Sequence, residues 1–137
     1  MMSAGKSLLD DADSTMPALS YAVALQTLAS KVGFDWSDPR GVLDKIQEEA
    51  EELLSEINAA APDKIQAELG DLLFAITNLA RHLNVDPQQA LQQTNQKFYR
   101  RFSFIEQQLT HQGKSVENAS LLEMDALWER SKTEQSV

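Results

Sequence analysis

The fold of this 137-residue chain is decided by residues 39–83, which read PRGVLDKIQEEAEELLSEINAAAPDKIQAELGDLLFAITNLARHL. Apolar residues recur here at spacings of three and four, which is the period of one helix face. Pro62 follows an alanine run in the middle of the stretch, and Pro is favoured at the first position of a helix. The stretch therefore predicts two amphipathic helices, at 39–59 and 62–83. Because the connection is short, we expect them to be antiparallel neighbours.

Helix-start signals recur along the chain, and strand-like alternation is absent. Pro17 and Pro87 follow residues that can cap a helix, and Ser120 to Glu123 forms a capping-box pattern. Three further helices are predicted, at 17–32, 87–112 and 120–133. The fold class is therefore all-α: a four-helix-type bundle with an additional C-terminal helix. We expect one domain at 14–133, between flexible tails at 1–13 and 134–137.

Composition excludes several classes of function. The chain has 12 Lys and Arg against 21 Asp and Glu, a net charge of −9, and no cysteine. An acidic surface argues against nucleic-acid binding, which requires basic groups. Without cysteine, disulfides, zinc–cysteine sites, iron–sulfur clusters and a cysteine nucleophile are excluded. The apolar runs are too short for a membrane span, and the N-terminus lacks the charge of a targeting peptide, so we expect a cytoplasmic protein.

The acidity is concentrated in residues 44–71, which hold nine acids and two bases. Glu49 and Glu52 stand three apart on one predicted helix, and Glu68 and Asp71 stand three apart on the next. In an antiparallel pair these carboxylates can face one another. They would repel unless a cation lay between them, and oxygen ligands favour Mg²⁺, with Mn²⁺ as a substitute. The alternative is a solvated helix face, the usual meaning of a charge run.

A di-iron centre is a weaker interpretation of the same acids. Such centres in helical bundles need two Glu-x-x-His motifs. The only histidines are His82 and His111, and neither has Glu three residues before it.

Gly70 lies between the second pair of acids, and glycine lowers the stability of a helix. A close approach of backbone or ligand at this position would explain the glycine. The alternative is a glycine without a function that the helix tolerates.

A basic segment follows in the fourth predicted helix. Lys97 and Arg101 stand four apart on one helix face, and such residues bind phosphate. The alternative to phosphate binding is that these residues form a cationic face beside the apolar side of the helix that packs in the core. Lys132 could add to a phosphate clamp, and Trp128, one turn earlier, could pack in the core or stack on a ligand. Gly33 is expected to end the first helix, and the aromatic residues that follow, Phe34 and Trp36, to be held against the core.

The order of these motifs resembles that of the MazG-type nucleoside triphosphate pyrophosphohydrolases, most closely the C-terminal catalytic domain of two-domain MazG proteins. The resemblance covers about residues 7–132. It rests on Glu49-x-x-Glu52 followed after fifteen residues by Glu68-Leu-Gly-Asp71, and then on Asn78-Leu-Ala-Arg81-His82, Asn95-x-Lys97-Phe-x-Arg100-Arg101-Phe102 and Met124-Asp-x-Leu-Trp128.

The resemblance implies an all-α protein that assembles as a homodimer or a dimer of dimers. It implies hydrolysis of nucleoside triphosphates between the α- and β-phosphates, in nucleotide-pool house-cleaning or stress regulation. The implied metal ligands and catalytic residues are Glu49, Glu52, Glu68 and Asp71, and the implied substrate contacts are Lys45, Lys64, Lys97, Arg101, Trp128 and Lys132. The alternatives are a narrower pyrophosphohydrolase, acting on dUTP, dCTP or phosphoribosyl-ATP, or a non-catalytic bundle that binds a nucleotide or a partner.

Overall fold

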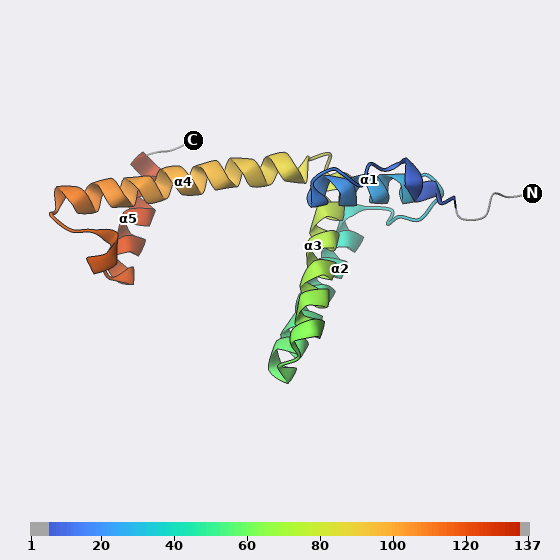
Figure 1. The fold of residues 1–137 in the computed structure, drawn as a ribbon, viewed down its shortest axis with the longest axis horizontal. Helices are drawn as coiled ribbons and strands as arrows, with labels where there is room; N and C mark the ends of the chain where they lie inside the picture. Colours follow the sequence, from blue (N-terminus) through green and yellow to red (C-terminus); the bar gives the residue numbers. More distant parts are fainter. Residues whose placement is uncertain (1–5, 135–137) are drawn as a thin grey trace, which may run out of the picture. The chain divides into compact units, whose positions relative to one another are not determined.

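The computed structural model describes residues 6–134, and these residues form helices and no strands (Figure 1). This confirms the all-α class. The elements are η1 (Leu8–Asp11), α1 (Ala18–Ser30), α2 (Pro39–Ala59), α3 (Pro62–His82), α4 (Pro87–His111), η2 (Val116–Asn118) and α5 (Leu121–Glu134). The chain divides into two compact units, residues 1–88 and 89–137, and each is described by itself.

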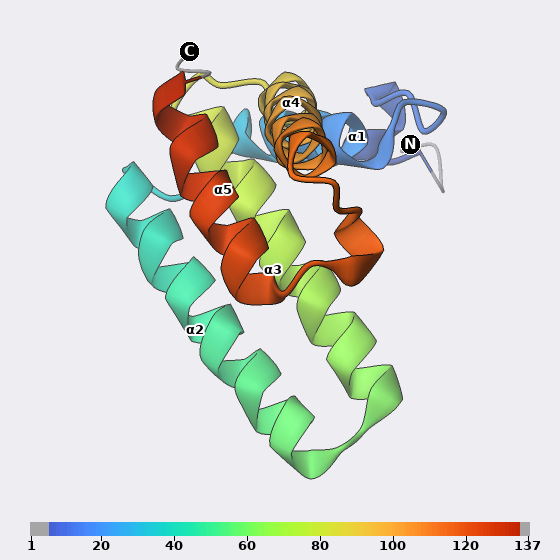
Figure 2. The ribbon, with the colours of Figure 1, turned by 90° about the vertical axis from the view of Figure 1, so that its left-hand side faces the viewer.

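The first unit is organised around the α2–α3 hairpin (Figure 2). Asp38 caps α2, since its Oδ1 accepts a hydrogen bond of 2.6 Å from the backbone N–H of Arg40. Ala60 takes a left-handed conformation, with φ of 53°, and this reverses the chain directly before Pro62. Helix α1 packs on α3. The antiparallel pair predicted from the sequence is therefore confirmed.

The second unit has a small apolar core of its own, made by α4 and α5. Ile105, Leu109 and Leu127 are buried at its centre. Partly buried apolar side chains surround them: Phe102, Val116, Ala119, Met124 and Trp128. The predicted capping box is present, because Glu123 N donates to Ser120 Oγ and Ser120 N donates to Glu123 Oε1, both at 3.1 Å.

The segment expected as an N-terminal tail contains an ordered turn. Leu8–Asp11 forms a 3₁₀-helix with its own capping box and packs beside α1. Residues 1–5 and 135–137 of the two predicted tails lie outside the described residues. The single domain at 14–133 and the bundle that it would form stay predictions.

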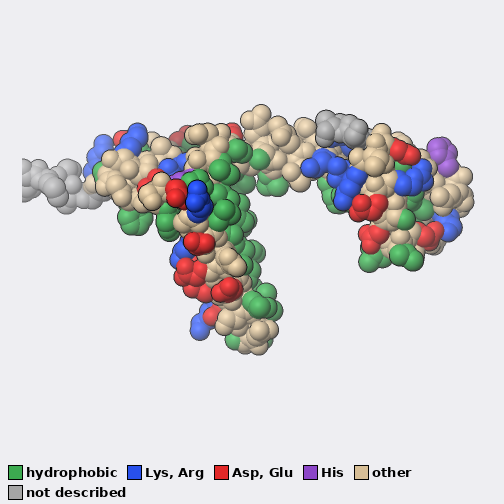
Figure 3. All heavy atoms as spheres, turned by 180° about the vertical axis from the view of Figure 1, so that it is seen from behind, with side chains coloured by type: hydrophobic (Ala, Val, Ile, Leu, Met, Phe, Trp, Pro, Cys, Tyr) green, Lys and Arg blue, Asp and Glu red, His purple; other side chains and the backbone are tan. Residues whose placement is uncertain are grey.

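The apolar stripes predicted on α2 and α3 are only partly covered within their unit. Val42 is buried, but other members of the two stripes are 43–57% exposed: Leu43, Leu54 and Ile57 on α2, and Leu69, Leu73 and Ile76 on α3. Hydrophobic and acidic side chains both reach the surface of this hairpin (Figure 3). No helix within residues 6–134 is long and apolar enough to cross a membrane.

The loop between α1 and α2 differs from expectation. Gly33, with φ of 86°, follows the end of α1, as predicted for a C-terminal cap. Phe34 and Trp36, however, are 80% and 45% exposed, so the expectation that the core holds them is wrong. The reason is that both rings line open cavities beside Phe74 and are not enclosed in the core. The Trp36 ring lies instead beside Gly41, in the first turn of α2.

The two helical glycines give a matched test of this packing. A Cβ at Gly70 would meet no heavy atom within 4 Å, so no close approach by the described residues accounts for this glycine. A Cβ at Gly41 would lie 2.7 Å from Trp36 Cδ1. We expect Gly70→Ala to raise the free energy of unfolding by up to about 1 kcal/mol through helix propensity. Gly41→Ala should gain less or lose stability, because Trp36 must move.

Urea unfolding of the two variants beside the parent measures this difference. An equal gain in stability from both substitutions would contradict the contact between Gly41 and the Trp36 ring.

Candidate active site

Three carboxylates converge between α2 and α3. One oxygen from each of Glu49, Glu68 and Asp71 lies within 4.8 Å of the other two. Glu49 comes from α2 and is only 5% exposed, whereas Glu68 is half-buried and Asp71 is exposed on α3. The spacing of three between Glu68 and Asp71 places them on one helix face, and the hairpin brings Glu49 opposite them.

The pKa values of two of these acids, Glu49 and Glu68, are shifted in opposite directions. The Lys45 ammonium lies 3.0 Å from Glu49 Oε1 and lowers the pKa of Glu49. Burial raises the pKa of Glu68 to about 7, with help from the nearby carboxylates of Glu49 and Glu52. Near neutral pH the group therefore holds two kinds of carboxyl, one paired with a lysine and one close to its titration point.

The donor set fits a hard divalent cation. Glu49 Oε2 and Glu68 Oε2 are enclosed by protein atoms and accept no hydrogen bond from the described residues. Such oxygens are costly when buried without a partner, and a cation would satisfy both. All the donors are carboxylate oxygens, which Mg²⁺ and Mn²⁺ prefer. The fourth predicted ligand, Glu52, is exposed and stands outside the group of three, although its charge acts on Glu68.

A cavity of about 350 Å³ adjoins the carboxylates. Its acidic end is formed by Glu49 and Asp71, with Lys45 beside them. The remaining wall is mainly aromatic and apolar: Phe34, Trp36, Val42, Phe74 and Ala75, with Asn78 as a polar member. Such a cavity can hold a flat, apolar ring at one end while charged groups act at the other.

The predicted substrate contacts fall into both units. In the first, Lys45 lies at the acidic cluster, whereas Lys64 is exposed in the first turn of α3. In the second, the Arg101 guanidinium lies 5.5 Å from the centroid of the Trp128 ring, a cation–π contact. Lys97 is exposed on α4. Lys132 is exposed on α5, and its ammonium lies 3.2 Å from Glu129 Oε1.

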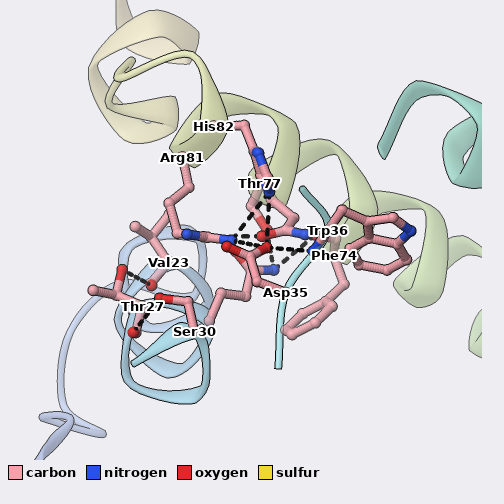
Figure 4. Close-up of polar contacts among 11 residues, drawn as sticks. Val23, Thr27, Ser30, Asp35, Trp36, Phe74, Thr77, Arg81 and His82 are labelled. Carbon is pink, nitrogen blue, oxygen red and sulfur yellow. Dashed lines mark hydrogen bonds and ion pairs between the residues drawn. The ribbon is translucent and has the colours of Figure 1, made fainter. Parts of the chain in front are cut away.

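A polar cluster that no sequence motif indicates holds the loop before α2 (Figure 4). Asp35 Oδ1 accepts hydrogen bonds from Arg81 Nη2 at 2.5 Å, from His82 Nε2 at 2.8 Å and from its neighbour's backbone, Trp36 N, at 2.8 Å. Burial raises the pKa of Asp35, but the hydrogen bonds from Arg81 and His82 outweigh it, so the pKa is lowered. The loop that carries the aromatic wall is therefore tied to the C-terminal end of α3.

One signal could have pointed to this region. Asn78 follows Asp71 by seven residues, which is two helical turns, so a polar residue continues the face of the acids among apolar neighbours. Asn78 is 6% exposed and Thr77 is 2% exposed. A buried polar residue at helical spacing from a charged pair indicates a functional site more strongly than the charged pair alone.

Comparison with known proteins agrees with the resemblance. Residues 38–103 match the model of the MazG nucleotide pyrophosphohydrolase domain. A Thermotoga maritima protein described as the nucleoside triphosphate pyrophosphohydrolase/pyrophosphatase MazG is 45% identical over 117 residues, covering 85% of this chain and 45% of that protein.

Two other bacterial proteins match over a similar span. An Escherichia coli K12 nucleoside triphosphate pyrophosphohydrolase is 40% identical over 131 residues, covering 94% of this chain and 50% of the relative. A Bacillus subtilis protein, YabN, described as uncharacterized, is 46% identical over 127 residues, covering 92% of this chain and 26% of that protein. The chain thus spans half or less of the length of these relatives.

The pKa of Glu68 predicts how pH affects divalent binding. Because folding raises this pKa from 4.5 to about 7, the folded protein binds more protons than the unfolded chain between these values. Without metal, this group makes the protein less stable as pH rises through that window. Mg²⁺ requires the deprotonated carboxylate, so its stabilising effect should be larger at about pH 8 than at about pH 6.

Thermal melting with and without Mg²⁺ at both pH values measures this effect. Glu68→Gln should abolish the difference between the two pH values, because it removes the titrating group. A pH dependence that survived this substitution would contradict the assignment to Glu68.

Proposed function

Because residues 38–103 match the model of the MazG nucleotide pyrophosphohydrolase domain, we propose that this chain hydrolyses nucleoside triphosphates between the α- and β-phosphates, with Mg²⁺ at the acidic cluster. The observation that carries the proposal is the convergence of Glu49, Glu68 and Asp71 around two enclosed, unpartnered carboxylate oxygens. The names of the Thermotoga maritima and Escherichia coli relatives support the same reaction class. The products would be a nucleoside monophosphate and pyrophosphate.

The metal ligands would be Glu49, Glu68 and Asp71, with Glu52 as the fourth. When bound there, Mg²⁺ would neutralise phosphate charge and lower the pKa of a coordinated water. The protein holds the carboxylates in place before the metal arrives, because Glu49 lies within the hairpin and Lys45 fixes one of its oxygens. Mn²⁺ satisfies the same oxygen donors and should substitute.

The base and the phosphates need different surroundings. The aromatic part of the 350 Å³ cavity suits the nucleobase, since it excludes water and offers flat surfaces. Lys45 and Lys64 in the first unit, and Lys97, Arg101 and Lys132 in the second, are the proposed phosphate contacts. Cationic side chains would stabilise the charge that develops on the departing pyrophosphate. Trp128, already in contact with a guanidinium, is proposed to lie beside the nucleotide.

A conservative substitution of one acid tests the reaction. Asp71→Asn keeps the size of the side chain and removes one charge, so Mg²⁺-dependent release of pyrophosphate should fall by about 100-fold or more. Glu51→Gln, which changes an exposed acid on the same hairpin outside the cluster, is the matched control and should leave the rate unchanged.

The substrates for this assay are the canonical nucleoside triphosphates together with dUTP and phosphoribosyl-ATP, each with and without Mg²⁺. Full activity of Asp71→Asn would remove the metal assignment. Turnover of dUTP, dCTP or phosphoribosyl-ATP alone would instead favour the narrower enzyme, and nucleotide binding without pyrophosphate release would favour the non-catalytic bundle.

We further propose that the exposed apolar stripes of α2 and α3 are covered by a second copy of the chain. Leu54 and Leu73 are 57% and 47% exposed, more than expected for members of regular helical stripes in a monomer. A closed two-fold arrangement would bury the same surface on both copies. The assembly could be a homodimer or a dimer of dimers.

Light scattering during size-exclusion chromatography tests this assembly. We expect a mass of at least twice 15.3 kDa for the parent and a shift toward the monomer for Leu73→Glu. Gln47→Glu places the same charge at an exposed polar position of α2 and should not change the mass. A monomeric parent would contradict self-association.

A further inference from the structure

Asn78 occupies a special position in the first unit. It lies in α3, is 6% exposed, and lines two cavities, of about 350 and 230 Å³. The larger cavity reaches the acidic cluster. The smaller one also touches α1, through Leu25 and Gln26. Both cavities share the aromatic wall of Phe34, Trp36 and Phe74. Asn78 is the polar side chain that lines both of them.

The orientation of the Asn78 amide is fixed by its neighbours. Arg81 Nε donates a hydrogen bond of 3.0 Å to Asn78 Oδ1. Because a guanidinium carries only donors, the atom that faces it must be the amide oxygen and not the nitrogen. Arg81 is itself held by Asp35, whose Oδ1 accepts from Arg81 Nη2. The ion pair between Asp35 and Arg81 therefore determines that the amide nitrogen points away from Arg81.

The amide nitrogen of Asn78 is unpartnered. No hydrogen bond among the described residues uses Nδ2, although the oxygen of the same amide is bonded. The enclosed side-chain atoms without a partner in this part of the chain are Gln26 Oε1, Glu49 Oε2 and Glu68 Oε2. Asn78 Nδ2 also makes no hydrogen bond with the described residues, but it is not among these enclosed atoms and is therefore exposed. Because the rest of Asn78 is buried, this nitrogen opens onto the cavities that the residue lines.

These observations define the chemistry of a ligand. The aromatic wall accommodates a flat ring, and two N–H donors on Nδ2 require an acceptor on that ring, either a carbonyl oxygen or an unprotonated ring nitrogen. The acidic cluster lies at the other end of the larger cavity. We propose that Asn78 Nδ2 donates a hydrogen bond to an acceptor on the nucleobase, and that Asp35 and Arg81 are positioning residues that orient this donor. The proposal rests on the proposed function.

Asn78→Asp isolates the donor. An aspartate keeps an oxygen for Arg81 Nε and has nearly the same shape, but it presents an acceptor where the N–H groups were. The KM for ATP and UTP should rise about tenfold or more, with kcat changed by less than about threefold, because a site built to donate now faces acceptors. Ribose 5-triphosphate has the same α–β bond and no base, so its kcat/KM should change by less than about threefold.

Two further variants separate this role from a structural one. Asn118→Asp makes the same substitution at an exposed position in η2 and should leave every constant unchanged. Arg81→Lys keeps a cation for Asp35 but removes the Nε donor, so the Asn78 amide is free to rotate. It should raise the KM for ATP by less than Asn78→Asp does, and it should leave the kcat/KM for ribose 5-triphosphate unchanged. Equal losses on ATP and ribose 5-triphosphate, or no loss on either, would overturn the proposal.

Binding of α,β-methylene-ATP distinguishes this proposal from the proposed function. The analogue cannot be cleaved between its α- and β-phosphates, so calorimetric titration of the parent and of Asn78→Asp with Mg²⁺ needs no turnover. If the parent cleaves no nucleotide, the proposed function fails, while a dissociation constant about tenfold weaker for Asn78→Asp still supports base recognition. Equal affinities for the analogue would reject Asn78 as the base contact.

Discussion

Repulsion between carboxylates across the α2–α3 hairpin is the constraint on which the rest of the structure depends. The apolar stripes determine how these two helices pair, and that pairing brings Glu49 against Glu68 and Asp71. Opposite charges at these positions would attract one another, whereas like charges repel. The hairpin instead keeps like charges together, holds one carboxyl near its titration point and offsets part of the repulsion with Lys45. The repulsion lowers the stability of the folded protein at this site, and a bound cation would restore it.

The sequence predicts the elements well because their signals are local. Pro39 and Pro62 mark helix starts, the Ser120–Glu123 capping box forms as its spacing indicates, and Gly33 takes the positive φ expected after a helix. The acidic pairs could also be found, since residues three apart share a helix face, and an antiparallel hairpin has few ways to arrange them. The match to the MazG domain model at residues 38–103 covers this same hairpin.

The rest could not be predicted because it depends on contacts between residues distant in the sequence. Nothing near Asp35 indicates that its partners are Arg81 and His82, 46 and 47 positions later. Phe34 and Trp36 lie in a loop between α1 and α2, where no periodicity predicts which side chains are exposed. The amide orientation of Asn78 depends on Arg81, one helical turn away, and therefore on Asp35 as well. Helical spacing identifies the faces of α2 and α3, but the loop anchored on them completes the cavity.

The two tryptophans of the chain lie in different units, and each adjoins residues with a different proposed role. Trp36 forms part of the aromatic wall beside the acids, whereas Trp128 contacts the Arg101 guanidinium. The protein therefore carries one intrinsic fluorophore for the proposed metal and base site and another for the proposed phosphate clamp. With either indole replaced by phenylalanine, the emission of the other would report a single event. The order in which cation, base and phosphates engage could then be followed without any added label.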